Sequence, residues 1–528
     1  MSSTLETDIV ELRKRGIVKL KDDDMYAIWV KTACGNLSSN QINKLAEITE
    51  SYGRGFLLFS SRQIPIIPFI KDDDLEAVQQ ALSSVYLTLD RCGPTVRNVN
   101  VCLGRLCPHI IADPLPLAQK LDNFFYAHMA NKVKLGVVGC AKDCIISRAL
   151  TDIGFVPATT DVRAGYNAYI GGRLGLNPGL GFKIAESLNE EECLRLVQNF
   201  FELMNREGRR GERAADLIER LGADAVRHEL HQTLSQVSGL EPIICPTSEL
   251  SCNTGKQTVK LRATAGEVTA AQLKEIANIA EGYGLGIVHF DVRGGPEIPG
   301  IAKADFEIVR REIAESGMAI IDGGLANLQS CFGGYCTESL ADPQALLKRI
   351  DVMARESGLA DVKMTISASG CPNSCGIAHL SDIGFYGIAE FEIDAKSCTG
   401  CGLCVPVCKR KAIEIIDGRV TINNEQCRHC GQCISVCPFN ALVEKKRGFT
   451  VLIGGRGGQD TRLGQLITGL VSEDEALAIT GRLMRLLRDT RTDAATLIDR
   501  WGLERVKDTL INPAEAPVSS ARVTTCAP

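Results

Sequence analysis

Cysteine is the residue type whose number and spacing in this sequence point most clearly to chemistry. The chain has 528 residues and 22 cysteines, most of them in short groups. In a long chain without an apolar secretory leader, grouped cysteines are more often metal ligands than parts of a disulfide framework. The spacing C-x2-C-x2-C-x3-C occurs twice, and Pro438 follows the second run. The two runs are Cys398, Cys401, Cys404 and Cys408, then Cys427, Cys430, Cys433 and Cys437.

This pair of runs resembles the bacterial two-cluster ferredoxin, in which the fourth cysteine of each run binds the cluster of the other run. The resemblance implies two 4Fe–4S clusters. The alternative is a pair of zinc knuckles, but zinc sites use paired ligands rather than three in a run. A two-cluster module passes single electrons, so another part of the chain must receive them. The implied ligand sets are Cys398, Cys401, Cys404 and Cys437 for one cluster, and Cys427, Cys430, Cys433 and Cys408 for the other.

The rest of the chain contains an internal duplication. Residues 35–63 align with 266–294 at an offset of 231 residues. In each copy an N-cap, Ser38 or Thr269, opens a predicted helix with apolar residues at helical spacing, and a strand follows. Cysteine groups and a GG-R turn also recur, but the turn returns at an offset of 283 residues. The larger offset indicates that the ferredoxin module interrupts the second copy.

The segments SGCPNSCGIAHLSDIGFYG, RNVNVC and FSSRQ resemble the siroheme-dependent sulfite and nitrite reductases. The resemblance implies an α+β fold with a duplicated sulfite/nitrite reductase architecture, in which two ferredoxin-like half-domains alternate with two siroheme-type α/β domains. Within this family an inserted 2×4Fe–4S ferredoxin domain is a feature of the dissimilatory and anaerobic branches. The predicted parts are an N-terminal arm (1–27), the first half-domain (28–93), the first siroheme-type domain (94–245), the second half-domain (255–322), the second siroheme-type domain (323–389 and 448–512), the inserted ferredoxin domain (390–447) and a flexible tail (513–528).

Each copy carries C-x4-C followed by C-x3-C, where the family usually has five residues in the first pair. The resemblance implies that the second set holds a 4Fe–4S cluster and that Cys375 bridges this cluster to the siroheme iron. The alternative is that these cysteines are buried packing residues without a ligand. The cysteines recur at the same positions beside glycines in both copies, which argues against this alternative. Cysteines without such pairing, including Cys92, are interpreted as packing or idle surface thiols. The paired sets are Cys102, Cys107, Cys140 and Cys144, then Cys331, Cys336, Cys371 and Cys375.

Reduction of a small oxyanion needs fixed positive charge around the anion and acids that release protons near neutral pH. Lysine in a crowded basic cavity suits the second task, because its pKa falls there. The resemblance places two arginines and two lysines at this face. Siroheme also carries carboxylates that arginines bind well, although the GG-R turns are equally open to a purely structural role. The predicted catalytic residues are Arg62, Arg97, Lys132 and Lys134, and the predicted cofactor-binding arginines are Arg163, Arg173 and Arg456.

The two copies are not equivalent at this site. The second copy has Arg293 and Lys363, but Ala326 stands at the position of Arg97. In the family, the basic groups of one half face the siroheme carried by the cluster of the other half. We therefore expect the C-terminal cysteine set to carry the working siroheme. For the N-terminal set two alternatives stay open: a second, catalytically weak cofactor or a bare cluster.

The leading interpretation is a siroheme- and iron–sulfur-dependent enzyme that reduces sulfite to sulfide with six electrons. Nitrite is the alternative substrate, and an electron-transfer subunit that has lost siroheme is the alternative class. The net charge of −5 and 45% hydrophobic residues argue against a nucleic-acid partner and favour a globular fold. We expect no membrane span and a cytoplasmic location, because no long apolar run appears. The expected partners are the oxyanion and an electron-donor protein or subunit, and oligomer formation is left open.

Overall fold

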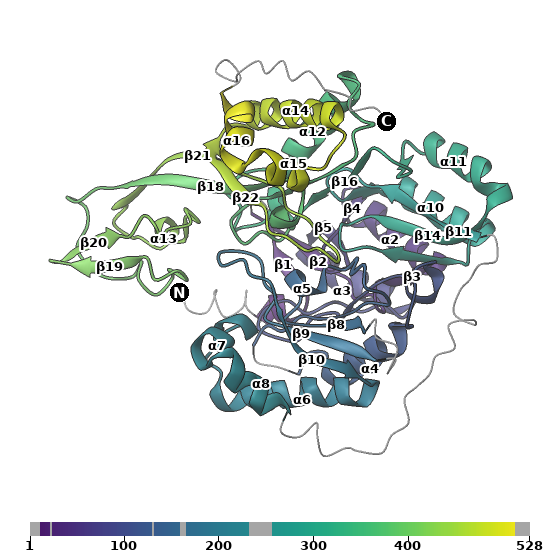
Figure 1. Ribbon diagram of the computed structural model, residues 1–528, viewed down its shortest axis with the longest axis horizontal. Helices are drawn as coiled ribbons and strands as arrows, with labels where there is room; N and C mark the ends of the chain where they lie inside the picture. Colours follow the sequence, from purple (N-terminus) through teal and green to yellow (C-terminus); the bar gives the residue numbers. More distant parts are fainter. Residues whose placement is uncertain (1–10, 22–23, 129–130, 159–164, 232–255, 513–528) are drawn as a thin grey trace, which may run out of the picture.

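The computed structural model describes residues 11–21, 24–128, 131–158, 165–231 and 256–512. Two half-domains form its centre, and each contributes a five-stranded sheet to which the other half-domain adds one edge strand (Figure 1). The first sheet has the order β1 (Ile17–Lys19), β2 (Met25–Trp29), β5 (Pro65–Lys71), β4 (Phe56–Phe59) and β12 (Glu267–Thr269). The second has the order β15 (Ala319–Ile320), β11 (Lys256–Arg262), β14 (Pro296–Ala302), β13 (Ile287–Phe290) and β3 (Asn36–Ser38).

The helices of the two half-domains repeat each other in detail. Ser38 and Thr269 are both N-caps, and each forms a capping box with a glutamine three residues later. Phe59 and Phe290, which are equivalent in the repeat, stack with ring centroids 4.0 Å apart. The half-domains therefore share one hydrophobic core across a pseudo-twofold axis. Their helices are α2 (Ser39–Ser51), α3 (Leu75–Ser83), α10 (Ala270–Gly282) and α11 (Phe306–Glu315), with the short 3-10 helices η1 (Asp72–Asp74) and η4 (Lys303–Asp305).

The first α/β domain is a sheet in which three parallel strands continue into two antiparallel ones. Its strands are β6 (Asn100–Val101), β7 (Leu135–Val137), β8 (Ile153–Pro157), β9 (Tyr166–Ile170) and β10 (Phe182–Leu188). Its helices are η2 (Gly104–Leu106), α4 (Leu115–Phe125), α5 (Ser147–Leu150), α6 (Glu190–Glu207), α7 (Ala214–Leu221) and α8 (Ala223–His231).

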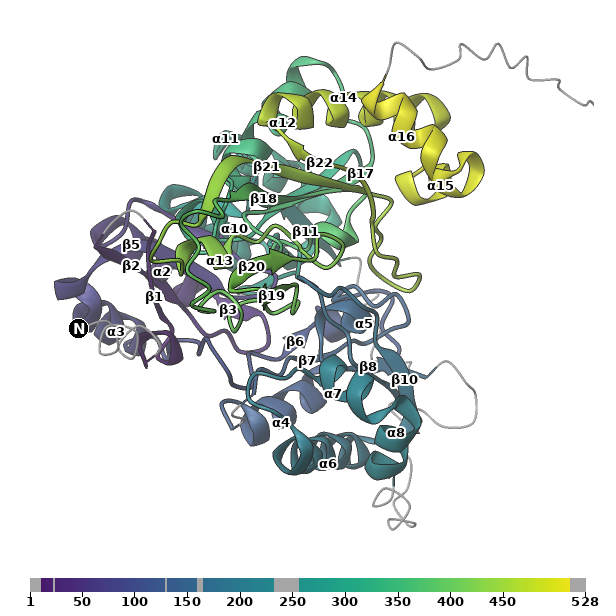
Figure 2. The same cartoon turned by 90° about the vertical axis from the view of Figure 1, so that its left-hand side faces the viewer.

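The second α/β domain has the same strand order and directions. Helices α6–α8 and their counterparts α14–α16 lie at opposite ends of the molecule (Figures 1 and 2). Its strands are β16 (Leu325–Ser330), β17 (Met364–Ser369), β18 (Ile383–Ile393), β21 (Leu442–Ile453) and β22 (Gln465–Val471). Its helices are η5 (Gly333–Tyr335), α12 (Pro343–Glu356), η6 (Ala378–Leu380), α14 (Glu473–Thr490), α15 (Ala494–Trp501) and α16 (Leu503–Ile511).

The ferredoxin module is inserted between β18 and β21. These two strands pair along their full length, from Ile383 opposite Ile453 to Ile393 opposite Leu442. The far end of this ladder leaves the domain and carries the module at the left of Figure 1. The module contains β19 (Ile413–Ile416), β20 (Arg419–Ile422) and α13 (Gln432–Ser435). The sequence prediction places the inserted domain at residues 390–447, and this boundary stays a prediction.

The predicted α+β architecture with its duplicated half-domains is confirmed. The structure starts the first half-domain earlier than the predicted boundary at residue 28, because β1 and β2 pair with each other and β2 pairs with β5. The predicted tail and the end of the first siroheme-type domain lie outside the described residues. Among the described helices, none is long and apolar enough to cross a bilayer.

Candidate functional site

The eight cysteines of the ferredoxin module line two separate cavities. Cys398, Cys401, Cys404 and Cys437 line the first. Cys408, Cys427, Cys430 and Cys433 line the second. Each cavity thus receives three cysteines from one run and the fourth from the other run, which is the grouping that the ferredoxin resemblance implies. The binding of clusters by these two groups remains a prediction.

The two C-x4-C…C-x3-C sets occupy equivalent places at the ends of the parallel strands. The Sγ of Cys102 accepts the Gly139 N–H at 3.2 Å, and the Sγ of Cys331 accepts the Gly370 N–H at 3.3 Å. Burial and the neighbouring thiols raise the pKa of Cys331, and burial raises the pKa of Cys336 to about 11. Thiolates crowded together in this way are costly without a cationic partner, so the set fits a bound iron–sulfur cluster.

A strained residue precedes the last cysteine of each set. Asp143 and Ser374 adopt left-handed φ values of 46° and 51°, which side chains other than glycine rarely adopt. Cys144 and Cys375 follow them, and each is the exposed cysteine of its set. Left-handed residues of this kind persist where the surrounding structure enforces them, often at functional sites. The two turns therefore present one sulfur of each set toward open space.

Each cysteine set is covered by elements of the opposite half of the chain. Ser61, in the turn after β4, donates its hydroxyl to the carbonyl oxygen of Cys375 at 3.0 Å. The GG-R turn of the first α/β domain approaches the same loop, where an added Cβ at Gly175 would stand 3.2 Å from the Asn373 carbonyl oxygen. In the other direction, an added Cβ at Gly458 would stand 3.0 Å from the carbonyl oxygen of Lys142. These contacts bring the turn before Arg62 and the GG-R turn of the first half against the C-terminal cysteine set.

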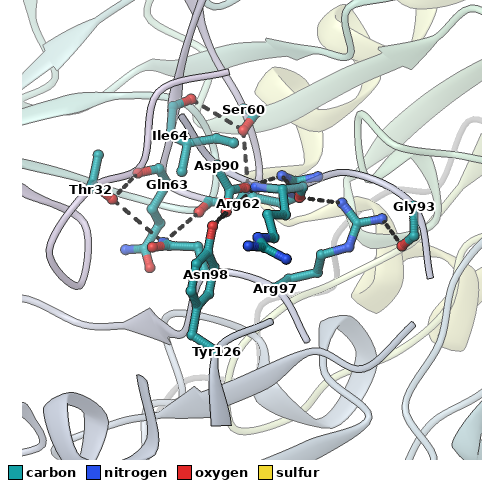
Figure 3. Close-up of polar contacts among 11 residues, drawn as sticks. Thr32, Ser60, Arg62, Gln63, Ile64, Asp90, Gly93, Arg97, Asn98 and Tyr126 are labelled. Atoms are coloured by element: carbon teal, nitrogen blue, oxygen red, sulfur yellow. Dashed lines mark hydrogen bonds and ion pairs between the residues drawn. The ribbon is translucent and has the colours of Figure 1, made fainter. Parts of the chain in front are cut away.

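Two arginines of this site are fixed by carboxylate and carbonyl oxygen atoms (Figure 3). Arg62 forms an ion pair with Asp90, which is fully buried and also accepts the Tyr126 hydroxyl at 3.0 Å. Arg97 donates to the carbonyl oxygens of Arg91 at 3.1 Å and Gly93 at 2.6 Å. The Nε atoms of both arginines are buried without a hydrogen-bond partner. These guanidinium groups are rigidly placed and retain donor capacity for a ligand.

The two lysines differ from the arginines because neither ammonium group has a hydrogen-bond or ion-pair partner among the described residues. Burial, with the charges of Lys134 and Arg213, holds the pKa of Lys132 well below its usual range. Burial lowers the pKa of Lys134 to about 8, and Arg213 adds to the effect. The Cys375 sulfur opposes both shifts, so the lysines lie close to the C-terminal cysteine set. They can bind an anion and release protons near neutral pH.

Sequence reasoning misses four residues of this basic site, namely Asp90, Cys92, Asp152 and Arg213. Asp90 neutralises Arg62, and Asp152 binds Arg213 through two hydrogen bonds of 2.7 and 2.9 Å. Cys92, interpreted from the sequence as a packing or idle thiol, lies against Arg97, and the charges of Arg97 and Arg62 lower its pKa in spite of burial. None of these residues carries a spacing signal, because their partners come from other segments of the chain.

A cavity of about 610 Å³ surrounds the N-terminal cysteine set, and two carboxylates, Asp291 and Glu297, line it together with Lys142, Lys256, Lys260 and Arg293. Lys260 forms an ion pair with Glu297, and Arg293 donates to the Leu380 carbonyl oxygen at 3.0 Å. Asp291 also lines this cavity, whereas Lys363 is exposed and does not line it. The two carboxylates reduce the positive charge of this wall, and the functional asymmetry of the two sites stays a prediction.

The predicted cofactor arginines have other partners in the structure. Arg173 binds Asp216 and Glu219 of α7, and Arg456 donates to Asp493 at 2.6 Å. These equivalent ion pairs attach each GG-R turn to the helices of its own domain, which favours the structural role. Contacts of either arginine with siroheme stay a prediction. Arg163 lies outside the described residues.

Comparisons with known proteins agree with this geometry. The model of the nitrite and sulphite reductase 4Fe-4S domain matches residues 92–237 and 323–518. The model of the nitrite/sulfite reductase ferredoxin-like half domain matches residues 18–85 and 253–316. The structure of the Mycobacterium tuberculosis NirA protein superimposes with a TM-score of 0.70 at 18% identity, covering 94% of this chain and 90% of that one. This likeness shows the shared fold.

Several relatives carry sulfite or nitrite reductase names. The coenzyme F420-dependent sulfite reductase of Methanocaldococcus jannaschii is 33% identical over 267 residues, which is 48% of this chain and 43% of that protein. One of the subunits of the anaerobic sulfite reductase of Salmonella typhimurium is 30% identical, over 49% of this chain and 84% of that protein. The chloroplastic ferredoxin–nitrite reductase of Spinacia oleracea is 24% identical, over 72% of this chain and 69% of that protein. The two domain models together span most of the described residues, and the chain belongs to the nitrite and sulfite reductase family.

Proposed function

We propose that this protein reduces sulfite to sulfide with six electrons, using siroheme and 4Fe–4S clusters. The observation that carries the proposal is the pair of unpartnered lysines, Lys132 and Lys134, that lies beside two fixed arginines and the exposed Cys375. An anion pocket of this kind would serve no purpose in a pure electron relay. We propose that Cys331, Cys336, Cys371 and Cys375 hold the cluster and that Cys375 also contacts the siroheme iron.

The bound siroheme would supply an iron atom that accepts the substrate and passes electrons to it. The residues of this chain would hold the anion and deliver protons. Arg97 cannot change its charge in the working pH range, so it would stabilise negative charge as S–O bonds break. Lys134, with a pKa of about 8, exchanges protons with water near neutral pH and would act as an acid. A proton can also reach the substrate through Lys132, whose pKa is lower than usual.

Electrons would enter through the ferredoxin module. Cys430 of the module and Cys371 of the C-terminal set line one small cavity, together with Glu338 and Gln432. No cysteine of the N-terminal set lines it. This neighbourhood supports a direct route from the module to the cluster of the working site. Replacing Cys433 by serine should therefore lower turnover with a protein donor more than turnover with a small reductant, and equal losses would contradict the relay role.

The proposal treats the N-terminal set as a cluster site without a working siroheme. Its wall carries the Lys260–Glu297 pair and Asp291, and these carboxylates offset part of the positive charge of Lys142, Lys256 and Arg293, which also line it. Three or four 4Fe–4S clusters would give roughly 12–16 iron atoms before siroheme iron is counted. Iron and acid-labile sulfide analysis of anaerobically purified protein tests this content. A value near eight would contradict cluster binding by both C-x4-C sets. We also propose a cytoplasmic location and a separate electron donor.

Nitrite is the second candidate substrate, because the nitrite reductase of Spinacia oleracea matches 72% of the chain. Nitrite is also a small oxyanion whose reduction consumes six electrons. Steady-state rates with sulfite and nitrite, both driven by reduced methyl viologen, decide between them. We expect the higher kcat/KM with sulfite and an optical band of siroheme in the red region. A spectrum showing only iron–sulfur absorption would support the electron-transfer alternative instead.

A further inference from the structure

One cysteine group of the ferredoxin module faces the body of the protein. The His429 carbonyl oxygen, next to Cys430, accepts the Ala389 N–H of β18 at 3.0 Å. Gln432 donates to Glu338, which belongs to the loop after Cys336. Arg428 donates to the carbonyl oxygen of Leu176 at 3.5 Å. The group of Cys408, Cys427, Cys430 and Cys433, here called the proximal group, is therefore packed against both α/β domains.

The other group, here called the distal group, points away from the body. Its cavity is lined only by residues between Cys398 and Leu442, all of them within the module. Figure 1 shows β19 and β20 at the end of the molecule farthest from the half-domains. Cys401 of this group is exposed, whereas the four proximal cysteines are intermediate or buried. The distal group is thus the one that a second protein can approach.

Large apolar side chains gather at the exposed surface of the module. Among the described residues, 14 large apolar side chains are exposed, and six of them lie between residues 393 and 443. Leu403 (52% exposed) and Phe439 (46% exposed) both line the distal cavity. Ile416 (50% exposed) precedes the β19–β20 turn, where an added Cβ at Gly400 would stand 2.3 Å from the Gly418 carbonyl oxygen. Leu403 and Phe439 therefore border the loop that carries Cys401, and Ile416 lies next to the turn that approaches this loop. These three residues are here called the distal rim.

We propose that the distal rim is the docking surface for a small one-electron donor protein of the ferredoxin type. This inference rests on the proposed function and assigns the order of electron transfer as donor, distal cluster, proximal cluster and then the cluster of Cys371. Exposed apolar groups of this kind mark interaction sites. Because Cys401 is exposed beside these side chains, the cluster of a bound donor can come close to the distal cluster. A docking surface elsewhere on the module would keep the two clusters farther apart.

The stoichiometry of the reaction favours a small, weak interface. Sulfite takes up six electrons and eight protons to leave hydrogen sulfide and three water molecules. A donor that carries one electron must bind reduced, lose that electron to the distal cluster and leave oxidised, six times for each sulfite. Electron-transfer complexes of this kind bury less than about 1,200 Å². A rim of three apolar side chains around one exposed ligand matches that requirement better than a large permanent interface.

The test uses a reduced ferredoxin with a single 4Fe–4S cluster as the donor and methyl viologen as a small comparison donor. Leu403→Gln and Phe439→Gln should each raise the KM for ferredoxin about tenfold, a loss of 1.4 kcal/mol in binding. The ratio of ferredoxin-driven to viologen-driven turnover should fall. Phe124→Gln in α4 and Leu466→Gln in β22 are matched controls, because Phe124 and Leu466 are 59% and 58% exposed on other surfaces. The controls should leave the KM for ferredoxin unchanged.

Binding of oxidised ferredoxin, measured by calorimetry, separates docking from turnover. We expect the rim variants to weaken this binding while their cluster absorption and iron content stay at the wild-type level. Unchanged binding and KM in both rim variants would overturn the proposal, and so would equal effects in the controls. The proposal would also be overturned if the rim is covered by a second copy of this chain. In that case the protein is a dimer, and the rim variants dissociate it without changing the KM for ferredoxin. Loss of sulfite turnover with intact ferredoxin binding would refute the proposed function and leave the docking surface standing.

Discussion

The Ser61 hydroxyl donates to the Cys375 carbonyl oxygen at 3.0 Å, although 314 residues separate the two in the chain. This bond joins the turn that carries Arg62 to the loop of the C-terminal cysteine set. It therefore fixes the basic groups of one half of the chain over the exposed sulfur of the other half. The site that we propose for sulfite exists only because the two halves cover each other.

Lys134 should set the alkaline limit of anion binding. Its pKa is about 8, so the side chain is charged below that pH and neutral above it. Affinity for the anion should therefore fall as the pH rises through 8. Lys134→Arg keeps the positive charge to much higher pH and should preserve affinity at pH 9, with a loss of proton delivery that lowers kcat. The KM for nitrite, whose own charge does not change in this range, measures the effect.

The control for this prediction is Lys363→Arg. Lys363 is the exposed counterpart of Lys132 in the second half and does not line the cavity of the N-terminal set. Its replacement should leave the pH profile unchanged. If Lys134→Arg gives the same pH profile as the wild-type protein, Lys134 does not set the charge of the anion pocket.

Asp90 should be more important for stability than for turnover. Its carboxylate is fully buried, pairs with Arg62 and accepts the Tyr126 hydroxyl. Removal of one partner from a buried pair leaves an uncompensated charge, which typically costs about 3–5 kcal/mol. Asp90→Asn should lower the free energy of unfolding by a large part of that amount in urea titrations. Asp122→Asn, on the neighbouring helix α4, offers a half-buried comparison and should cost less. Equal costs would contradict the buried-pair account.

The two halves should respond differently to loss of an arginine. Arg97→Ala should lower turnover with sulfite by roughly 100- to 1,000-fold, because a fixed positive group stabilises developing charge. Arg293→Ala should be nearly silent, since Arg293 faces the N-terminal set and donates to the Leu380 carbonyl oxygen. Initial rates normalised to bound siroheme measure both effects. Comparable losses in the two variants would mean that both sites turn over.

The repeat visible in the sequence predicts the pseudo-twofold architecture correctly. Ser38 and Thr269 stand at an offset of 231 residues and form the same capping box, and the stacked Phe59 and Phe290 have the same offset. Capping and apolar spacing are local features, so the sequence contains them directly. The cavities of the ferredoxin cysteines also follow the predicted grouping, because each run closes within a few residues.

Features that depend on distant segments could not be predicted in this way. The exchange of β3 and β12 between the half-domain sheets arises from tertiary packing and has no sequence signal. The same holds for Asp90 beside Arg62 and for Cys92 beside Arg97. A glycine-flanked arginine such as Arg173 can serve a ligand or a neighbouring helix, and only the partners Asp216 and Glu219 distinguish the two.

The central claim is that sulfite is reduced at the C-terminal cysteine set and not at its N-terminal equivalent. The direct measurement compares sulfide formed per bound siroheme in Cys375→Ser and Cys144→Ser, with reduced methyl viologen as the donor. Both residues are the exposed members of equivalent sets, so each variant is the matched control of the other. The account predicts that Cys375→Ser forms no sulfide and that Cys144→Ser keeps near wild-type turnover per siroheme. Sulfide formation by Cys375→Ser together with its loss in Cys144→Ser would contradict the account.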